Sequence, residues 1–351
     1  MTNRFYSLQY LRALAAWMLV FHHYVQVFRD FQPENAAEKV FAYYGSLGVD
    51  IFFVLSGFIM AFSMTRRQNT AARFVLDRIT RIVPAYWLAT IVLLIVLSQY
   101  NWGGIAFLQG TSWRDLLYSF LFIPHQHVSG LGVFPVLTVG WTLNFEMFFY
   151  LLLAIGLLIN NRRAVLITVV LVFALPLFSR AVFHLGAIPN SFLLYEFAFG
   201  LLIYLVGVQF LRLPEKGFVL RYGLATLCAI TALAAMKLRF HGYDMIVSVA
   251  LVLGFVVAED VFALLSRGLG RFVVHLGDLS YSTYLFHVPV LVAVGAHMDI
   301  SRSNDLWLVL AMCGLTYAAS WLSYTFVEQR FRTWMTGQMR RRKDLTHKSA
   351  I

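Results

Sequence analysis

Long apolar stretches follow one another along the chain, separated by short polar segments. We predict ten apolar helices from them, near residues 7–28, 45–65, 82–99, 138–159, 164–180, 191–209, 222–237, 244–260, 279–297 and 306–327. Unbroken runs of this kind are typical of transmembrane helices, because the strands of a membrane barrel show ten-residue alternation instead. The apolar piece 115–124 is too short to cross a bilayer, and we expect it to be interfacial or re-entrant.

Composition places the chain among membrane proteins. Its 351 residues are 60% hydrophobic and 13% charged, with a mean hydropathy of +0.71, whereas about a quarter of the residues of a soluble domain are charged. Because the bilayer core holds no water, spanning segments must be helices or closed barrels, and we expect an all-α polytopic membrane protein. The first apolar run lacks a small-residue cleavage site, so it is predicted to be a retained span.

The basic residues predict how the chain is oriented. Ten spans put both termini on one side of the membrane. With that side cytoplasmic, 20 of the 28 Lys and Arg residues lie inside, seven lie outside, and Arg12 lies within the first span. This is the bias of a protein with both termini in the cytoplasm, and it predicts no nucleic-acid partner despite the net charge of +11. We expect one transmembrane domain, 1–335, and a short basic cytoplasmic tail, 336–351.

The first predicted span carries a permanent cation and a titratable base. Arg12 and His23 are eleven residues, or about three turns, apart, so they project from one face about 16 Å apart along the axis. An arginine inside a span costs about 2.5–3.5 kcal/mol to insert, and such residues usually face a bundle interior or a wet cavity. Alternatively, Arg12 snorkels to the headgroups and the histidines His22 and His23 hydrogen-bond to other helices.

An acid opens the second predicted span, in the sequence GVDIFFVLSGF. We expect Asp50 to lie roughly 7 Å inside the outer surface, at the depth of His23. An acid beside a histidine would orient the imidazole and raise its basicity. The alternative for Asp50 is an ordinary residue at the start of a helix.

A second carboxylate lies deeper, in the sequence VGWTLNFEMFFY of the fourth span. Thr142, Glu146 and Tyr150 share one helical face because they are four residues apart. A carboxylate at this depth is a candidate functional residue, and we expect His23 or an arginine as its partner. Trp141 is interpreted as an interface or packing residue, or as a substrate contact.

The ninth span, LGDLSYSTYLFHVPV, carries a polar stripe. Ser280, Tyr284 and His287 share a face, with His287 near mid-membrane. Asp278 is predicted to be the N-cap of this helix. The stripe favours a functional role for His287 over a simple interhelical hydrogen bond.

The inner segment RRQNTAARFVLDRITRIVP is strongly basic. Arg78 and Arg81 are three residues apart and lie on one face, and guanidinium groups bind phosphates in a bidentate manner. An anionic ligand on the inner side is therefore as plausible as a role in topology alone. Because both cysteines lie within spans and no zinc spacing occurs, we expect no metal.

Six motifs, in order along nearly the whole chain, resemble those of acyltransferase family 3 membrane proteins, especially the exopolysaccharide and nodulation-factor O-acetyltransferase branch. They are Arg12-x10-His23, GVDIFFVLSGFIM, RxxR at Arg78 and Arg81, VGWTLNFEMFFY, SYSTYLFHVPV and FVEQRFR. The resemblance implies a ten-helix enzyme of the bacterial inner membrane, without the family's optional soluble hydrolase-like domain. It would move an acyl group, commonly acetyl, from cytoplasmic acyl-CoA to a hydroxyl of an exopolysaccharide, another cell-surface glycan or a lipid-linked precursor.

The resemblance also implies roles for the site residues. We expect catalysis from Arg12, His23, Asp50 and Glu146, CoA binding from Arg78, Arg81 and Arg12, and substrate contacts from Trp141, Tyr150, Tyr284 and His287. His23 would take the proton of the acceptor hydroxyl or carry the acyl group itself, and Tyr284 or Trp141 would support the oxyanion. Membrane lipids, other polysaccharide-synthesis proteins and a second copy of the chain are candidate partners.

Two other classes of function fit parts of the sequence. A transporter or flippase for a glycan, lipid-linked sugar or acyl donor would show helices broken by Gly or Pro at mid-membrane and internal repeat symmetry. Pro84 and Pro289 favour this alternative mildly, but the sequence shows no internal repeat. A sensor or receptor would not need a basic phosphate-binding segment.

Overall fold

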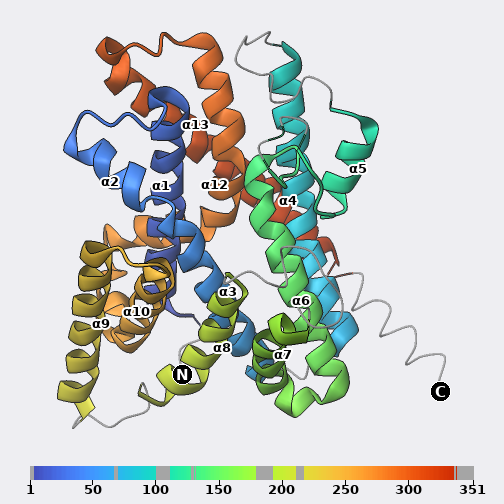
Figure 1. The fold of residues 1–351 in the computed structure, drawn as a ribbon, viewed down its shortest axis with the longest axis vertical. Helices are drawn as coiled ribbons and strands as arrows, with labels where there is room; N and C mark the ends of the chain where they lie inside the picture. The colour runs from blue at the N-terminus through green and yellow to red at the C-terminus, as the bar shows by residue number, and fades with distance from the viewer. Residues whose placement is uncertain are drawn as a thin grey trace. The chain divides into compact units, whose positions relative to one another are not determined.

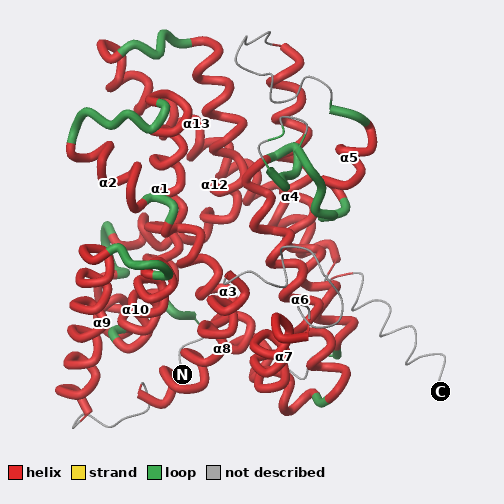
Figure 2. The backbone as a smooth tube through the Cα atoms, in the orientation of Figure 1, coloured by secondary structure: helices red, strands yellow, loops and turns green. Residues whose placement is uncertain are grey.

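The fold is helical throughout the part of the chain that the structure describes. This computed structural model describes residues 4–66, 70–99, 111–127, 130, 132–178, 193–210, 217–335 and 337. Within these ranges no strand forms, and one isolated bridge joins Gln126 and Val133 (Figure 2). The prediction of an all-α protein is confirmed, while the predicted tail 336–351, apart from Gly337, lies outside the described residues.

Thirteen α-helices are described, and each of the ten predicted ranges coincides with at least one of them. They are α1 (Tyr6–Arg29), α2 (Ala36–Tyr44), α3 (Leu47–Arg66), α4 (Ala71–Gln99), α5 (Trp113–Phe120), α6 (Trp141–Ile159), α7 (Ala164–Phe178), α8 (Leu193–Phe210), α9 (Phe218–Leu238), α10 (Tyr243–Val257), α11 (Glu259–Leu265), α12 (Gly270–His297) and α13 (Asp305–Ser323) (Figure 1). Short 3-10 turns precede α6, α7 and α13, namely η1 (Thr138–Gly140), η2 (Asn161–Arg163) and η5 (Arg302–Asn304), and a π-helix, η6 (Tyr324–Gln329), follows α13.

Six of the described helical segments are long and apolar enough to cross a membrane. They are Leu47–Met64, Ala71–Gln99, Thr138–Ile159, Phe218–Leu238, Gly270–His297 and Arg302–Met335. The pair α10 and α11, bent by 71°, would add a seventh as one broken span. The chain is therefore a multi-pass membrane protein.

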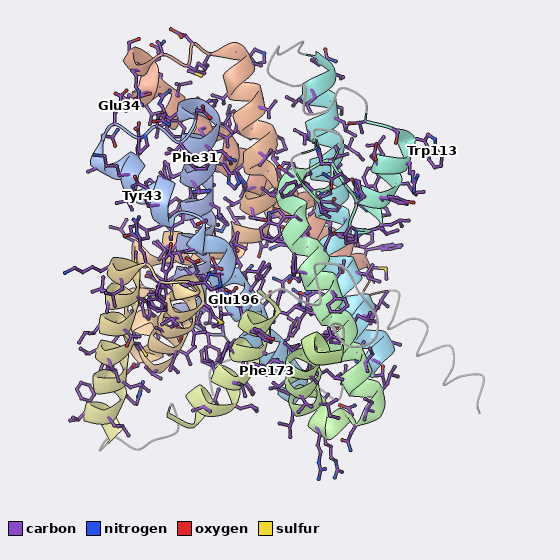
Figure 3. All side chains as sticks on the ribbon, in the orientation of Figure 1. Phe31, Glu34, Tyr43, Trp113, Phe173 and Glu196 are labelled. Atoms are coloured by element: carbon purple, nitrogen blue, oxygen red, sulfur yellow. The ribbon has the colours of Figure 1, made fainter. Side chains whose placement is uncertain are left out.

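Helix α5 has eight residues and its Trp113, 76% exposed, points away from the ribbon (Figure 3).

Two helices begin well before the apolar runs that predicted them. Helix α4 begins at Ala71 rather than near residue 82, so Arg78 and Arg81 lie within a helix and not in a loop. Helix α12 begins at Gly270, so Asp278 lies inside it and the predicted N-cap is wrong. Hydropathy marks the stretch of a helix that lipid covers, but polar residues can extend the same helix beyond it. Pro84 and Pro289 also lie inside continuous helices.

Contacts between Cα atoms divide the chain into two compact units, which are described separately. Unit 1 comprises Met1–Ala72 and Phe145–Ser280, and unit 2 comprises Arg73–Asn144 and Tyr281–Ile351. Unit 1 holds α1–α3, α7–α11 and parts of α6 and α12. Unit 2 holds α5, α13, most of α4 and the remaining parts of α6 and α12.

The core of unit 1 is an apolar cluster of α1, α3, α8 and α10. It contains Leu8, Leu11, Ile51, Val54, Phe58, Ile203 and Val252, among others. Helices α3 and α8 cross in direct backbone contact, because a Cβ on Gly57 would lie 2.0 Å from the Phe197 oxygen and one on Gly200 2.0 Å from the Val54 oxygen. Small residues at such crossings let helices approach closely where lipid provides no hydrophobic driving force. This crossing fixes the neighbourhood of the polar residues that follow.

The start of α1 is held by polar contacts within unit 1. Glu259 of α11 accepts hydrogen bonds from the backbone N–H groups of Tyr6 and Ser7, at 2.8 and 2.9 Å. These N–H groups have no partner inside the helix, so the carboxylate acts as a distant cap. Arg4 adds a bidentate ion pair to Asp278 at 2.7 and 2.8 Å. The position of α1, and with it Arg12 and His23, is thus tied to α11 and α12.

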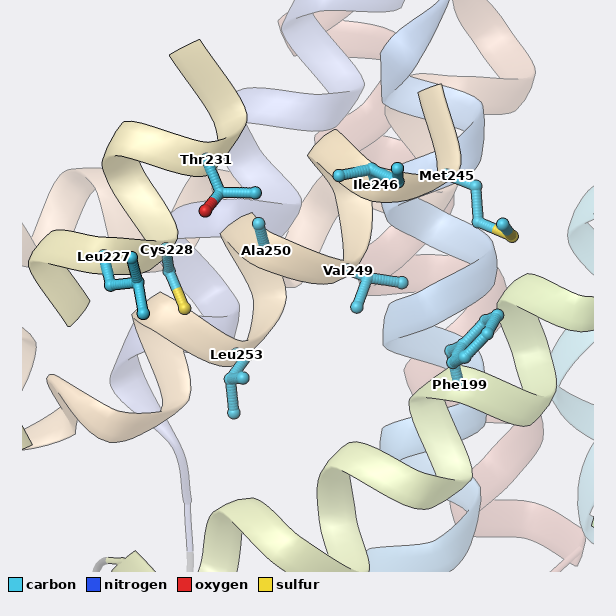
Figure 4. Close-up of a pocket in the computed structure, with 9 residues that line it drawn as sticks. All are labelled: Phe199, Leu227, Cys228, Thr231, Met245, Ile246, Val249, Ala250 and Leu253. Atoms are coloured by element: carbon cyan, nitrogen blue, oxygen red, sulfur yellow. The ribbon is translucent and has the colours of Figure 1, made fainter. Parts of the chain in front are cut away.

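An apolar cavity of about 310 Å³ lies among α8, α9 and α10 (Figure 4). Its lining is formed by Phe199, Leu227, Cys228, Thr231, Met245, Ile246, Val249, Ala250 and Leu253. The buried Cys228 contributes its thiol as a small hydrophobic group. None of the predicted site residues lines this cavity.

Candidate active site

His23 is held in one tautomer by its own helix. Its Nδ1 lies 2.8 Å from the backbone oxygen of Leu19. A carbonyl oxygen only accepts hydrogen bonds, so Nδ1 carries the proton of the neutral ring and Nε2 carries the lone pair. His22 is oriented similarly, with Nδ1 2.9 Å from the oxygen of Phe41, and the two rings are perpendicular with centroids 5.4 Å apart. The neutral ring of the half-buried His23 therefore carries its lone pair on Nε2, and its predicted role as a base stays a prediction.

Arg12 meets a residue of the predicted polar stripe. Its Nε donates to the hydroxyl of Ser280, fully buried on α12, at 3.1 Å. Helices α1 and α12 pack closely enough for this contact. A Cβ on Gly277 of α12 would lie only 2.2 Å from the backbone oxygen of Gln9 in α1. Arg12 is thus directed into unit 1, as expected for a cation in a bundle interior rather than one that snorkels outward.

Asp50 has a different partner from the one the sequence predicted. Its side chain is hydrogen-bonded to the carboxyl group of Glu196 on α8. In the antiparallel packing of α1 and α3, Gly45 lies against Met18 and His22, and Gly48 lies against Ala15 and Leu19. Asp50 therefore lies roughly 10 Å from the level of His23 along the axis, and the expectation of matching depth is wrong. The error arises because the apolar run does not mark where α3 begins relative to the end of α1.

Glu146 receives two hydroxyl hydrogen bonds on one oxygen. Ser56 of α3 donates to Oε1 at 3.0 Å, and Tyr150 donates to the same atom in a very short hydrogen bond. The predicted common face of Glu146 and Tyr150 is confirmed. Since both neighbours donate, Oε1 acts purely as an acceptor, which suits a carboxylate. Tyr150 thereby orients Glu146, and its predicted substrate contact stays a prediction.

The basic pair lies on α4 in unit 2. Arg78 and Arg81 are one turn apart and both half-buried, and the Arg78 guanidinium lies 5.7 Å from the centroid of the Phe74 ring. An aromatic face of this kind restricts the orientation of a guanidinium group. Both arginines lie within one helix, and their predicted binding of an anionic group stays a prediction.

Tyr284 organises the start of α6 in unit 2. Its hydroxyl donates to the backbone oxygen of Val139 at 2.5 Å and lies 2.8 Å from Thr142 Oγ1. A tyrosine hydroxyl has one proton, so Tyr284 could support an oxyanion only after this bond breaks. Trp141 is the first residue of α6, directly after η1. His287 is fully buried on α12, with Nδ1 3.2 Å from the oxygen of Thr283.

Sequence reasoning missed one acidic residue that the structure connects to a polar partner. Glu196 lies in the apolar run LLYEFAFG, where an ionisable residue is itself a signal of function. Glu328, in the FVEQRFR motif, is spaced for an ion pair with Arg332 four residues later. In the structure it accepts a very short hydrogen bond from Ser282, whose hydroxyl also lies 2.9 Å from Ser323. Hydropathy could have identified Glu196, whereas the contact of Glu328 with Ser282 is visible only from packing.

The site residues fall into small clusters that the sequence did not separate. Unit 1 brings together Arg12 with Ser280, Asp50 with Glu196, and Glu146 with Ser56 and Tyr150. Unit 2 brings together Thr142 with Tyr284, and holds Arg78, Arg81, Trp141 and His287. The roles predicted for these residues stay predictions. Among the described residues no cluster of His, Cys, Asp and Glu could hold a metal ion.

Comparison with known proteins gives matches over most of the chain. A family model for the acyltransferase domain matches residues 5–325. The chain is 35% identical over 279 residues to the exopolysaccharide production protein ExoZ of Rhizobium meliloti (strain 1021), covering 74% of this chain and 81% of that protein. It is 26% identical over 325 residues to a Bacillus subtilis (strain 168) protein named "Putative peptidoglycan O-acetyltransferase YrhL", covering 82% of this chain and 51% of that protein.

No solved structure matches the chain. The family model nevertheless spans both units and every predicted site residue from Arg12 to His287. The chain belongs to acyltransferase family 3.

Proposed function

We propose that this protein transfers an acyl group, most simply acetyl, from cytoplasmic acyl-CoA to a hydroxyl of a bacterial surface glycan. An exopolysaccharide or its lipid-linked precursor is the preferred acceptor, because ExoZ is named for exopolysaccharide production. The name of the second relative supports acetyl as the group and oxygen as the acceptor atom. The single observation that carries the proposal is the tautomer of His23, which leaves Nε2 as the base.

We propose a topology of ten spans in the inner membrane, with both termini in the cytoplasm. The coincidence of helices with all ten apolar ranges supports the number of spans. The 20-to-7 distribution of basic residues supports the orientation. In this topology Arg78 and Arg81 belong to the cytoplasmic end of α4, on the side where acyl-CoA is made.

The arginines and the histidine have different roles in the proposed reaction. Arg78 and Arg81 bind phosphate groups of the donor, since guanidinium groups match phosphate oxygens in a bidentate manner. Arg12, oriented by Ser280, adds a positive charge within the membrane part of unit 1. His23 acts on the reacting atoms. Binding and chemistry can therefore be separated by substitution.

The chemistry follows from the neutral imidazole. Nε2 of His23 removes the proton of the acceptor hydroxyl while the oxygen attacks the thioester carbonyl. A C–O bond forms, the C–S bond breaks, and the proton finally joins the CoA thiolate. Glu146, held by Ser56 and Tyr150, supplies a fixed negative charge in the membrane part of unit 1. In a second route Nε2 itself attacks the thioester and the acyl group then passes to the hydroxyl.

Acetyl-CoA binding by the purified full-length protein tests the donor assignment. The double variant Arg78→Ala with Arg81→Ala should weaken acetyl-CoA binding by on the order of 10²-fold, because each charge-assisted hydrogen bond contributes about 1.5–3 kcal/mol. The matched control is Arg162→Ala with Arg163→Ala, which removes two arginines from η2. The control variant should bind acetyl-CoA as the wild type does.

The same experiment contains the outcome that overturns the donor assignment. A wild-type protein with no affinity for acetyl-CoA, or for succinyl- or longer acyl-CoA, cannot use this class of donor. Equal weakening of acetyl-CoA binding in both double variants would show that the arginines of α4 act only through general electrostatic attraction and not through specific phosphate contacts.

A transporter remains the alternative class from the sequence. Its expected broken helices do not occur at Pro84 or Pro289, where α4 and α12 continue. The break between α10 and α11 is the described bend of 71°, and it presents Glu259 to α1. Family membership supports transfer chemistry, so we propose no transport function.

A further inference from the structure

We propose that Asp50 and Glu196 form a proton-binding site within unit 1, in which a proton on Glu196 is donated to Asp50. The two residues come from α3 and α8, and their carboxyl groups are hydrogen-bonded to each other. The inference rests on the proposed function only for the use of that proton in acyl transfer. The existence of the site stands on its own.

A hydrogen bond between two carboxyl groups requires a proton. Carboxylate oxygens only accept, so two ionised groups at this distance would repel each other without any bond. Glu196 is 3% exposed, and its Oε2 is fully buried and receives no hydrogen bond from an N–H or hydroxyl group of the described residues. A proton shared by the two carboxyl groups gives the buried Glu196 side chain the hydrogen bond that no N–H or hydroxyl group provides.

The surroundings indicate which partner is protonated. The Asp50 side chain also accepts a hydrogen bond from its own backbone N–H, which suits the ionised form. Glu196 has no such donor. Asp244 of α10 lies close enough to repel both groups, and it has its own donor in the hydroxyl of Tyr243. The proton therefore belongs on Glu196, with Asp50 as its acceptor.

No cation of the described residues is found beside this cluster. The causes that shift the two carboxyl groups include Asp244 but no Lys, Arg or His of the described residues. Neither Asp50 nor Glu196 has a further interaction with a described residue. A buried carboxylate without a cation is strongly disfavoured, and protonation is the remaining way to reduce its charge.

The backbone crossing of α3 and α8 keeps the two groups together. Asp50 precedes Gly57 by seven residues and Glu196 precedes Gly200 by four, so each carboxyl group lies one to two turns before the same glycine crossing. Because Cβ atoms at the crossing would meet backbone oxygens at 2.0 Å, the helices cannot be this close with any other residue. The pair is thus a built site rather than a chance approach of two flexible side chains. Figure 3 marks Glu196 on α8.

A singly protonated pair can both accept and release a proton. Acyl transfer from a thioester to a hydroxyl breaks one O–H bond and forms one S–H bond, so one proton must pass from the acceptor oxygen to the CoA thiolate. In the proposed reaction His23 takes that proton, which ends on the CoA thiolate, so the reaction balances with or without the pair. The pair can exchange a proton with this path, because Asp50 can accept one and Glu196 can release one while His23 stays the base.

Infrared spectroscopy of the purified full-length protein without acyl-CoA tests the site. At pH 7 the wild type should show the C=O stretching band of a protonated carboxylic acid. Glu196→Gln should remove the band, and Asp50→Asn should shift its frequency, because the proton of Glu196 then meets an amide in place of a carboxylate. The matched control Asp260→Asn, at an exposed acid paired with Arg221, should leave the band unchanged.

Carboxyl-13C labelling of aspartate and glutamate in the wild type covers the case in which a variant does not fold. A band that shifts with glutamate labelling supports the assignment to Glu196. A wild type without the band overturns the proposal, as does a band that persists in Glu196→Gln or shifts with neither label. Because this infrared experiment contains no acyl-CoA, a result that overturns the proton-binding site leaves the assignment of acyl-CoA as donor substrate unchanged.

Acetyl transfer tests the use of the proton. Glu196→Gln should lower the transfer rate by on the order of 10²-fold, the scale of a lost proton transfer, with the Kd for acetyl-CoA unchanged. An unchanged rate would overturn the role in turnover, even where the infrared band is present. A loss of acetyl-CoA binding in the wild type would instead count against the proposed function.

Discussion

Glu146 and Glu196 are the same residue type in apolar helices of the same unit, yet their surroundings call for opposite protonation states. Glu146 is half-buried, and Oε1 accepts hydrogen bonds from the hydroxyls of Ser56 and Tyr150. Glu196 is 3% exposed and meets the carboxyl group of Asp50. Donors stabilise a charged carboxylate, whereas a second carboxyl group requires a proton. The chemistry of an intramembrane acid is therefore decided by its partners and not by its depth alone.

For the two glutamates, the largest expected effect comes from removing the charge of Glu146. Glu146→Gln keeps an oxygen that can accept from Ser56 and Tyr150, so the packing of unit 1 should survive. The rate of labelled acetyl transfer should fall by on the order of 10²- to 10³-fold, because a preorganised charge is lost. Glu34→Gln, at an exposed acid after α1, is the control and should transfer normally. A rate within twofold of the wild type would show that Glu146 is only structural.

Removing both donors should convert Glu146 into a site that resembles Glu196. In Ser56→Ala with Tyr150→Phe, the carboxylate loses two hydrogen bonds, each contributing about 1.5–3 kcal/mol when the acceptor is charged. We expect a lower thermal midpoint and a new infrared band of a protonated acid. If the band does not appear although the protein is destabilised, the two hydroxyls do not control the charge of Glu146.

Separating α3 from α8 should weaken the contact between Glu196 and Asp50. Gly57→Ala places a Cβ 2.0 Å from the Phe197 oxygen, and the helices must move apart at a cost of about 1–3 kcal/mol. The protonated-acid band assigned to Glu196 should weaken or shift with the loss of stability.

Gly223→Ala is the matched control for this substitution. It lies in α9 of the same unit, and no atom would lie within 4 Å of its new Cβ. Its effect should be neutral or slightly stabilising, since glycine inside a helix costs about 0.5–1 kcal/mol relative to alanine. Equal losses in both variants would show that the crossing has no special role.

The smallest expected effect concerns Asp115, an exposed carboxylate. It adds a solvent-accessible acid to the comparison of the two glutamates. Asp115 of α5 accepts hydrogen bonds from the hydroxyl and backbone N–H of Ser112, at 2.7 and 2.8 Å, and these bonds lower its pKa. Because the folded pKa is below the unfolded value, the stabilisation is present above the unfolded pKa and is lost as the pH falls through the folded pKa.

Hydrogen exchange of the α5 amides measures this effect. Ser112→Ala should cost at most about 1 kcal/mol of local stability, discounted further by solvent screening at this exposed site. It should also weaken the pH dependence described above, because only the backbone N–H of residue 112 then donates to Asp115. Unchanged protection in the variant at neutral pH would mean that the capping box does not stabilise α5.

Sequence reasoning located the helices well and the partners of the polar residues poorly. All ten apolar ranges contain helices, because the cost of burying unpaired backbone groups in lipid leaves few alternatives. The beginnings of α4 and α12 were missed, since hydropathy does not report a helix that continues into a polar environment. The common face of Glu146 and Tyr150 was predicted because it is a property of one helix.

Contacts between helices depend on register, which no pattern in a single sequence fixes. Asp50 was expected beside His23 but lies beside Glu196. Glycines at the contacts of α3 with α1 and with α8 set the depth at which these helices pack. The contact of Arg12 with Ser280, 268 residues away, has the same origin. Glu196 was overlooked although a lone acid in an apolar run is a recognised signal.

The adjacent histidines offer the most direct test of the central claim, that His23 is the base of an acyltransferase. Both rings have Nδ1 on a backbone oxygen, so His22→Ala is a control of equal chemistry, one residue away. With acetyl-CoA as donor and the purified surface glycan as acceptor, His23→Ala should bind acetyl-CoA normally and lose on the order of 10²- to 10⁴-fold in labelled acetyl transfer. His22→Ala should lose less than tenfold. Equal rates for His23→Ala and the wild type would contradict the account.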